Sequence, residues 1–373
     1  CHFSYFGVPE SESDGFDLPD NSCPVCGNAL KADGHNLPCE FFMGYEGNKA
    51  PNIDLNFSAS KRDAEFAFLR ELFGADRLAH AGTITTLRER FAQRYITCYE
   101  AETADYFTEE QRKYICEKIC GIKLGEGNHP GGILVLPEGI EFEDFTPLRD
   151  NTTHSSIKKV SHFNFLNLHD TILKLDVLGH LVLDMLKMLE DFTGRSIQDV
   201  PWNAPEIYAL FARADTLGIP EFGTDFTKNM LQKTKPGCFA DLVQVSGLSH
   251  GTNTWLDNGE MLLADGHALN ELPALSDSLF LQLLSYGIER KSAFRIAEYT
   301  RKGKLRFEND NTAELIRIMQ GANVPEWYIK SLQKIQYMFP KAHAVAYVKN
   351  AVRMAWFKMH YPTEFYAAYL SCY

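Results

Sequence analysis

The chain has 373 residues, enough for two or three domains, and its 45% hydrophobic content excludes a disordered protein. No apolar run approaches the ~20 residues of a membrane span, and the first residues do not form a signal peptide. Nine scattered cysteines favour a reducing compartment over a disulfide framework. We therefore expect a cytoplasmic protein without a membrane segment. Its first residue, Cys1, suggests a piece of a longer protein.

The net charge of −12 is unevenly distributed along the chain. Residues 286–373 carry 14 basic and 7 acidic side chains, a balance of +7, so the preceding residues carry 23 basic and 42 acidic ones, a balance of −19. A basic end suits a surface that faces phosphates, and an acidic front suits metal capture. Ordinary solvated helix faces explain the individual charges, but they explain this asymmetry less well.

The first forty residues contain a CxxC sequence at Cys23 and Cys26, with the small neighbours typical of zinc knuckles. A structural zinc ion needs four ligands, and no second CxxC pair is visible here. Cys1 is a third candidate ligand, and His35 or Cys39 is an alternative for the remaining position. The competing interpretation is an isolated CxxC loop without metal.

Residues 51–57 alternate apolar and polar side chains, which predicts a strand with its apolar side chains facing a core. Three short polar side chains then line the other face: Asn52, Asp54 and Asn56. Because Asp and Asn are poor strand formers, a hard cation bound by oxygen ligands would explain them. The alternative is a strand with one solvated face.

The next segments are predicted to be helical. One helix spans residues 61–73, with an apolar stripe made of Ala64, Phe68 and Leu72. A second runs from about residue 83 to 99. A third begins after Thr108, a predicted N-cap, and ends near residue 120.

A turn at residues 127–132 returns the chain to a strand, and His129 lies between its glycines. On its own this histidine is more typical of a structural residue than of a catalytic one. Residues 172–179 form another alternating strand, with Lys174 and Asp176 on the face opposite its apolar core. If this strand joins the sheet of Asp54, the two carboxylates can hold divalent ions about 4 Å apart, as in phosphoryl transfer.

After residue 179 the pattern is almost wholly helical, with a basic run at residues 301–306 and a final long helix at 341–360. The long helix has a buried stripe that includes Ala344, Val348 and Ala351. Lys341 and Lys358 are predicted to lie off this stripe.

Six motifs in order resemble the PolC-type α subunit of bacterial DNA polymerase III, over almost the whole chain. They are Pro51–Phe57, Gly127–Gly132, Leu173–His180, Gly218–Thr224, Val245–Thr252 and Tyr337–His343. Six motifs in the family's order are far more specific than any single one.

The resemblance implies an α/β palm with a polymerase-β-like nucleotidyltransferase sheet at residues 41–82 and 128–179. A helical thumb insertion at 83–127 would grip the duplex along its minor groove, and residues 180–373 would form a mostly α-helical fingers domain. Residues 1–40 would be a cysteine-rich, zinc-knuckle-like segment, since the family has a CxxC pair near Cys1. The implied function is template-directed nucleotidyl transfer from dNTPs to primer-template DNA in chromosomal replication. The full-length protein would also bind the sliding clamp and clamp loader.

Asp54 and Asp176 match two of the family's three catalytic aspartates and would bind two Mg²⁺ ions, with Asn52 at the third position. The resemblance makes His129 a DNA contact near the primer. It also brings basic residues of the fingers to the triphosphate or template: His250, Arg301, Lys302, Lys341 and His343.

The departures from the family pattern matter. An amide at Asn52 replaces a carboxylate, and Asn164 stands where the family tends to have Asp. The family's Gly/Ser-rich phosphate-binding strand, its PHP and exonuclease domains and its clamp-binding tail are not in this sequence. The alternative function is therefore a catalytically impaired or inactive DNA-binding polymerase fragment.

Overall fold

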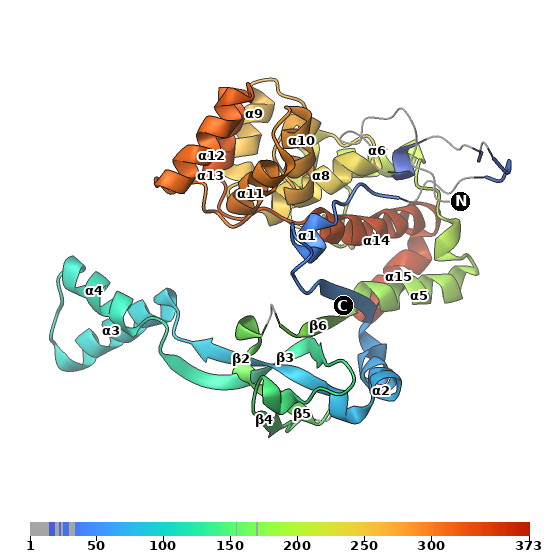
Figure 1. Ribbon diagram of the computed structural model, residues 1–373. Coiled ribbons are helices and arrows are strands. Elements are labelled where there is room, and N and C mark those ends of the chain that lie inside the picture. The colour runs from blue at the N-terminus through green and yellow to red at the C-terminus, as the bar shows by residue number, and fades with distance from the viewer. Residues whose placement is uncertain (1–14, 19–21, 24, 30–33, 154, 169–170) are drawn as a thin grey trace. The chain divides into compact units, whose positions relative to one another are not determined.

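The computed structural model describes residues 15–18, 22–23, 25–29, 34–153, 155–168 and 171–373. These residues form two compact units, one of residues 49–180 and one of residues 181–373 with the described part of 1–48. The first contains a β-sheet and a helical hairpin, and the second is almost wholly helical (Figure 1). The predicted α/β region followed by a helical region is confirmed.

The unit of residues 49–180 is built on a six-stranded mixed sheet with the order β1-β6-β3-β2-β5-β4. Its strands are β1 (Asn52–Ser58), β2 (Leu78–Thr86), β3 (Lys123–Val135), β4 (Leu148–Asp150), β5 (Lys159–Asn164) and β6 (Leu173–His180). β1 is parallel to β6 and β2 is parallel to β5, whereas the other neighbours are antiparallel. The two acidic strands predicted from sequence are therefore direct neighbours in one sheet.

Apolar side chains cover both faces of the sheet. On one face α2 (Arg62–Phe73) packs Phe66 and Leu69 against the strands, and the apolar side chains of β1 join this core as predicted. On the other face, two 3₁₀ turns, η4 (Phe142–Asp144) and η5 (Phe165–Asn167), cover a second core. The predicted stripe of α2 is wrong, since Phe68 and Leu72 are 56% and 59% exposed. The helix is rotated so that Phe66 and Leu69, three residues apart, face the sheet.

A bulge interrupts the pairing of β3 with β2. The register passes from Gly82 opposite Asn128 to His80 opposite Ile133, so residues 129–132 face a single residue of β2. Gly131 permits this arrangement, because a Cβ atom there would collide with the carbonyl oxygen of Val177 in the neighbouring strand. His129 is carried on this bulge.

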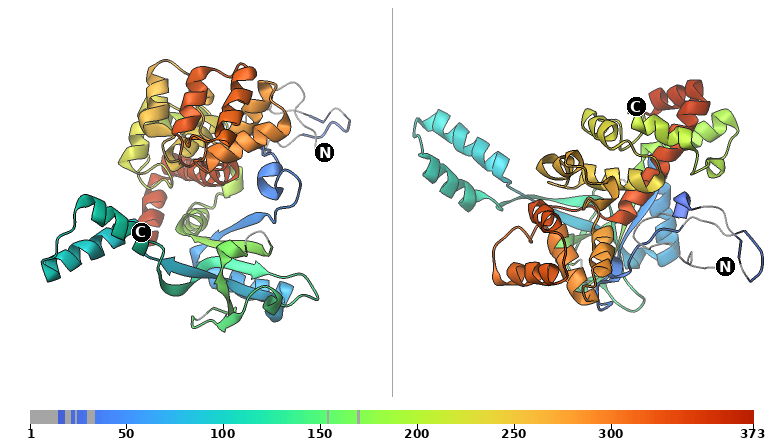
Figure 2. Two further views of the ribbon diagram at one scale, coloured as in Figure 1. Left: turned by 60° about the vertical axis from the view of Figure 1, so that its left-hand side comes forward. Right: turned by 90° about the horizontal axis from the view of Figure 1, so that it is seen from above.

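Between β2 and β3 the chain forms a hairpin of two helices, α3 (Glu89–Thr103) and α4 (Glu109–Ile119). The helices lie side by side beyond the end of the sheet (Figures 1 and 2). Thr108 caps α4 in a capping box with Gln111, as its sequence predicts. The prediction of helix from residue 83 is wrong, because the β-branched run Thr83–Thr86 continues β2.

The unit of residues 181–373 surrounds α14 (Lys341–His360), which packs against α5 (Leu181–Thr193), α6 (Pro205–Ala212), α8 (Phe239–His250), α10 (Ser276–Ser285) and α15 (Pro362–Cys372). The remaining helices are α1 (Glu40–Met43), α7 (Asp225–Thr234), α9 (Glu260–Ala264), α11 (Arg290–Arg301), α12 (Asp310–Gly321) and α13 (Glu326–Lys334). The buried stripe of α14 is confirmed at Ala344, Val348 and Ala351. Lys341 and Lys358, predicted to lie off the stripe, are buried as well.

The bulge yields a prediction about stability. We expect Gly131→Ala to lower the free energy of unfolding by roughly 2–4 kcal/mol, because the new methyl group must displace backbone atoms of β6. Gly125→Ala is the matched control in the same strand. No atom lies near a Cβ at Gly125, so its cost should stay near 1 kcal/mol or below. Urea unfolding followed by circular dichroism measures the stability of both variants. Equal midpoints would show that the bulge accommodates the new methyl group at no extra cost.

Candidate active site

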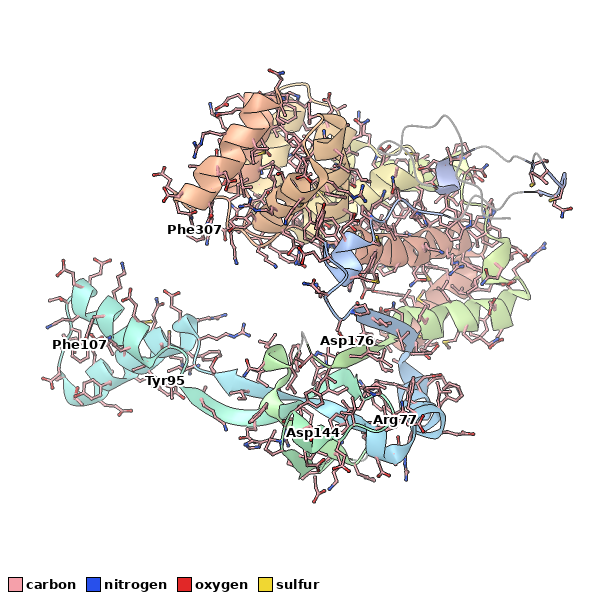
Figure 3. All side chains as sticks on the ribbon, viewed as in Figure 1. Arg77, Tyr95, Phe107, Asp144, Asp176 and Phe307 are labelled. Carbon is pink, nitrogen blue, oxygen red and sulfur yellow. The ribbon has the colours of Figure 1, made fainter. Side chains whose placement is uncertain are left out.

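Two carboxylates meet on adjacent strands of the sheet. Asp54 and Asp176 are direct partners in the parallel pair β1–β6, and Gly132 of β3 lies opposite Asp176 on its other side. Leu175 and Val177 point into the core beneath α2, so Asp176 points to the opposite face. Residues in register on neighbouring strands share a face, which brings Asp54 to the same side. Figure 3 marks Asp176 in this sheet.

A buried ion pair fixes one oxygen of Asp176. The Lys174 Nζ atom lies 2.8 Å from Asp176 Oδ2, and both side chains are about nine-tenths buried. The same ammonium group lies 4.4 Å from the centre of the Phe165 ring, which adds a cation–π contact. Since a buried carboxylate is costly without a counter-charge, Lys174 offsets part of the cost of burying Asp176.

The other oxygen, Asp176 Oδ1, is buried and accepts no hydrogen bond within the described structure. Its neighbour at 3.8 Å is Nδ1 of His129. This nitrogen accepts a hydrogen bond from the backbone N–H of Gly132 at 2.6 Å, so it carries no proton. Burial lowers the pKa of His129, although the charge of Asp176 opposes that shift. Oδ1 can therefore accept a cation, and a carboxylate oxygen suits a divalent ion, whereas the single lone pair of His129 Nδ1 is already taken by the Gly132 N–H.

The acidic pair is nevertheless a weak metal site by charge. Within the described residues, no three His, Cys, Asp or Glu side chains come together as metal ligands. Asp54 and Asp176 contribute −2 and Lys174 contributes +1, and these three side chains alone sum to −1. Asn52, which pairs with Lys174 in the strand register, adds no charge.

The CxxC loop is partly described, and Cys1 lies outside the described residues. The N–H of Cys23 donates to the carbonyl of Asn28 at 2.8 Å, and the N–H of Gly27 donates back to Cys23 at 2.9 Å. Backbone N–H groups of Cys26 and Val25 hold the pKa of the buried Cys23 thiol below its usual value. The loop thus favours a thiolate at Cys23, while Cys26 is exposed.

In the helical unit, His250 forms the best-defined contact of the predicted basic residues. Its Nε2 atom lies 2.7 Å from Glu221 Oε2, and its Nδ1 lies 2.9 Å from the carbonyl oxygen of Ser246. The hydrogen bond with Glu221 raises the pKa of His250 despite its partial burial. The imidazole also stacks on Phe339, with ring centres 4.6 Å apart.

Three motifs distant in sequence meet at this place. Phe339 contacts His250 on one side and the ring of His343 on another, at 5.8 Å. A backbone bridge joins Thr252 to Tyr337, and the N–H of Met338 donates to the carbonyl of Arg301 at 3.2 Å. The structure therefore brings together His250, His343 and the backbone of Arg301.

The other predicted basic residues differ in their surroundings. Arg301 holds Glu298 through two hydrogen bonds, at 2.6 and 3.1 Å, and Lys302 contacts the same carboxylate at 2.6 Å. Two cations thus share one acidic group. Lys341 is 8% exposed, and its backbone N–H donates to Asp277 Oδ2 at 3.0 Å. This residue belongs to the helix start and its packing.

Sequence reasoning assigned no role to four side chains that define these sites: Lys174, Phe165, Glu221 and Glu298. Lys174 had a usable signal, since a lysine two residues before an aspartate on an apolar strand must share its face. Glu298 had one too, since it lies three and four residues before Arg301 and Lys302 on a predicted helix. Phe165 and Glu221 become partners only through tertiary contacts, for which their local sequence carries no signal.

Comparisons with known proteins agree with this division of the chain. The family model "bacterial DNA polymerase III alpha subunit finger domain" matches residues 175–284. The model "bacterial DNA polymerase III alpha NTPase domain" matches residues 27–110 and 98–179. The sheet with its acidic pair and the first part of the helical unit thus correspond to neighbouring regions of bacterial replicative polymerase α subunits.

Curated relatives cover nearly the whole chain. The PolC-type DNA polymerase III of Lacticaseibacillus paracasei is 41% identical over 100% of this chain and 26% of its own length. That of Bacillus subtilis is 41% identical over 100% of this chain and 27% of its own, and that of Thermotoga petrophila is 42% identical over 98% and 28%. The chain belongs to the PolC-type DNA polymerase III family. It spans about a quarter of the length of these relatives.

The His250–Glu221 pair predicts a pH-dependent stability. Because the folded pKa of His250 is raised, protonation stabilises the fold. This contribution is fully present below the unfolded value of about 6.5 and is lost as pH rises through the folded pKa. We expect Glu221→Gln to lower the free energy of unfolding by about 1 kcal/mol near pH 5.5 and by much less near pH 9.

Glu271→Gln is the matched control, since Glu271 lies 3.7 Å from His267 but is 53% exposed. Its effect should stay below about 0.5 kcal/mol at both pH values. Denaturant unfolding at the two pH values gives the comparison. A Glu221→Gln cost that does not change with pH would contradict the prediction.

Proposed function

We propose that this chain is the nucleotidyl-transfer core of a DNA-directed DNA polymerase that acts in chromosomal replication. In this proposal the sheet of residues 49–180 is the palm, the α3–α4 hairpin is the thumb and the helical unit is the fingers. The observation that carries the proposal is the pair of in-register carboxylates, Asp54 and Asp176, with one buried oxygen that accepts no hydrogen bond. Membership of the PolC-type family supports the same reaction.

Each residue of the acidic site has a role in this proposal. Asp54 and Asp176 hold Mg²⁺, which when bound activates the primer 3′-hydroxyl and neutralises the triphosphate and pyrophosphate. Lys174 holds Asp176 Oδ2 and so directs Oδ1 away from the ion pair. His129 accepts a hydrogen bond from the N–H of Gly132 and so stabilises the bulge. Its side chain remains neutral, which suits a contact with DNA near the primer end.

The helical unit would bind the incoming dNTP and the template strand. His250, held by Glu221 and stacked on Phe339, has a raised pKa and favours its cationic form beside a phosphate. His343 lies on the same aromatic ring, and Lys302, with a 48% exposed side chain, extends the basic surface. Arg301 adds its positive charge to this surface while its guanidinium binds Glu298. Lys341 is buried and has a structural role at the start of α14.

Further partners follow from the family. Zn²⁺ is proposed at the Cys23 and Cys26 loop, with Cys1 as a third ligand. The sliding clamp and clamp loader are proposed partners of the full-length protein, which we expect to act in the cytoplasm. In the part of the chain that the structure describes, no helix is both long and apolar enough to cross a membrane.

The second candidate function is a catalytically impaired polymerase fragment that still binds DNA. The specific observation is that residue 52 is Asn, so the strand that carries Asp54 has one carboxylate fewer than it would have with an aspartate there. Affinity for hard cations depends on the number of charged oxygen ligands. A site with two carboxylates rather than three should hold two divalent ions poorly.

The two candidates are separated by Asn52→Asp. Residue 52 pairs with Lys174 in the strand register and lies two positions from Asp54, so a carboxylate there would add a third acidic group to the site. We expect Mn²⁺ to bind the chain roughly tenfold more tightly or better. In the complete gene product, single-nucleotide primer extension should rise by orders of magnitude, since a missing ligand weakens the site by roughly several kcal/mol.

Gln111→Glu is the matched control, because it adds the same unit of charge on α4, outside the β1–β6 pair, and keeps the capping box with Thr108. It should leave Mn²⁺ affinity within about twofold of the parent chain. Mn²⁺ binding is measured by electron paramagnetic resonance, and extension is measured over a Mg²⁺ titration. Equal values for the parent and Asn52→Asp would mean that the metal site is assigned to the wrong strand.

A second prediction concerns Lys174→Met. Removal of the ammonium group leaves Asp176 buried without a counter-charge, so we expect a loss of about 3–5 kcal/mol of stability. Mg²⁺ should restore part of this loss, because a divalent ion can replace the missing charge at Asp176. Lys159→Met removes an exposed pair with Asp150, at 2.9 Å, and should leave the stability nearly unchanged, because water screens this pair. Thermal unfolding with Mg²⁺ or with EDTA decides it, and identical melting in both would argue against a cation at Asp176.

A further inference from the structure

Two cysteine thiols face each other at the end of α4. The Sγ atoms of Cys116 and Cys120 lie 3.9 Å apart. The N–H of Cys120 donates to the carbonyl of Cys116 at 2.9 Å, so the two residues are one helical turn apart. Four residues of α-helix advance about 6 Å, which is within the Cα separation that a disulfide spans.

The two thiols differ in accessibility. Cys116 is 6% exposed and packs in the small core of the hairpin with Leu87, Ala92 and Ile96. Its thiol also lies 3.9 Å from the carbonyl oxygen of Glu89. Cys120 is partly exposed and lies just beyond the last helical residue. A reagent in solution therefore reaches Cys120 first.

The pair lies where the hairpin joins the sheet. Leu87 and the segment after Cys120 exchange two backbone hydrogen bonds, from Gly121 N–H to Leu87 O and from Leu87 N–H to Ile122 O, both at 2.9 Å. β2 ends at Thr86 and β3 begins at Lys123. A covalent change at Cys120 thus acts on the joint through which both helices connect to the strands.

We propose that Cys116 and Cys120 form an oxidation site, in which a hydroperoxide oxidises Cys120 and Cys116 resolves the product as a disulfide. The Cys120 thiolate attacks the peroxide oxygen, the O–O bond breaks, and the products are the sulfenic acid of Cys120 and an alcohol or water. The Cys116 thiol then attacks the sulfenic sulfur, forming the S–S bond and releasing water. The peroxide is reduced by two electrons and the dithiol is oxidised by two.

The local backbone suits this second step. The sulfur atoms must approach from 3.9 Å to about 2 Å, and Cys120 has an extended ψ of 139° at the helix end, so it is not fixed by a following helical turn. Burial raises the pKa of the Cys116 thiol, so the thiolate available for this step increases over a higher pH range than for a free cysteine. Bond formation withdraws the Cys116 sulfur from the carbonyl of Glu89.

Hydrogen peroxide and dimedone, a trap for sulfenic acids, test the proposal in the intact chain, with peptide mapping by mass spectrometry. In the parent chain we expect a peptide with a Cys116–Cys120 disulfide, reversible by dithiothreitol, and little dimedone on Cys120. In Cys116→Ala, where no resolving thiol remains, dimedone on Cys120 should increase by roughly tenfold. Cys116→Val provides the same test should the alanine variant fold poorly.

Cys98 is the internal control, because it is an exposed cysteine on α3 for which no thiol neighbour is found among the described residues. Dimedone should label Cys98 equally in the parent chain and in both variants. The proposal is overturned if Cys120 is trapped equally in parent and variants. It is also overturned if residues 116 and 120 stay reduced at a peroxide dose that fully modifies Cys98.

Discussion

The buried pair of Lys174 and Asp176 is the constraint on which the acidic site depends. β6 lies between β1 and β3, with apolar cores on both faces of the sheet, so a carboxylate there is stable only with a counter-charge. The strand period supplies one, since residues two apart share a face. The same arrangement leaves the other oxygen of Asp176 without a hydrogen bond in the described structure, 3.8 Å from His129 Nδ1.

In the helical unit, basic residues from segments distant in sequence come together. Phe339 organises it, because two histidines from different motifs pack on its ring. Backbone hydrogen bonds between loops, rather than helix packing alone, bring the segment around Tyr337 to Thr252 and to Arg301. Carboxylates such as Glu221 and Glu298 hold the cations in place.

The sequence predicted those features that have a strong local period. The faces of β1 and β6, the capping box of Thr108 and the bounds of α14 follow from alternation, capping chemistry and helical spacing. Prediction failed where the local sequence allows several arrangements equally well and tertiary packing decides between them. The rotation of α2 depends on the sheet it covers, and the burial of Lys358 depends on oxygen atoms of Asp215 and Leu217. Among the site residues, their strands and faces were predictable, but their ion-pair partners were mostly not.

The α3–α4 hairpin has its own apolar core, made of Leu87, Ala92, Ile96 and Cys116, which shares no residue with the two cores of the sheet. Its opening therefore exposes only a small part of the apolar surface of the unit. Such a segment can unfold and refold by itself, at a fraction of the free energy of global unfolding, while β1 and β6 remain paired. The hairpin is thus a separate cooperative element, whose order can change without disturbing the carboxylates.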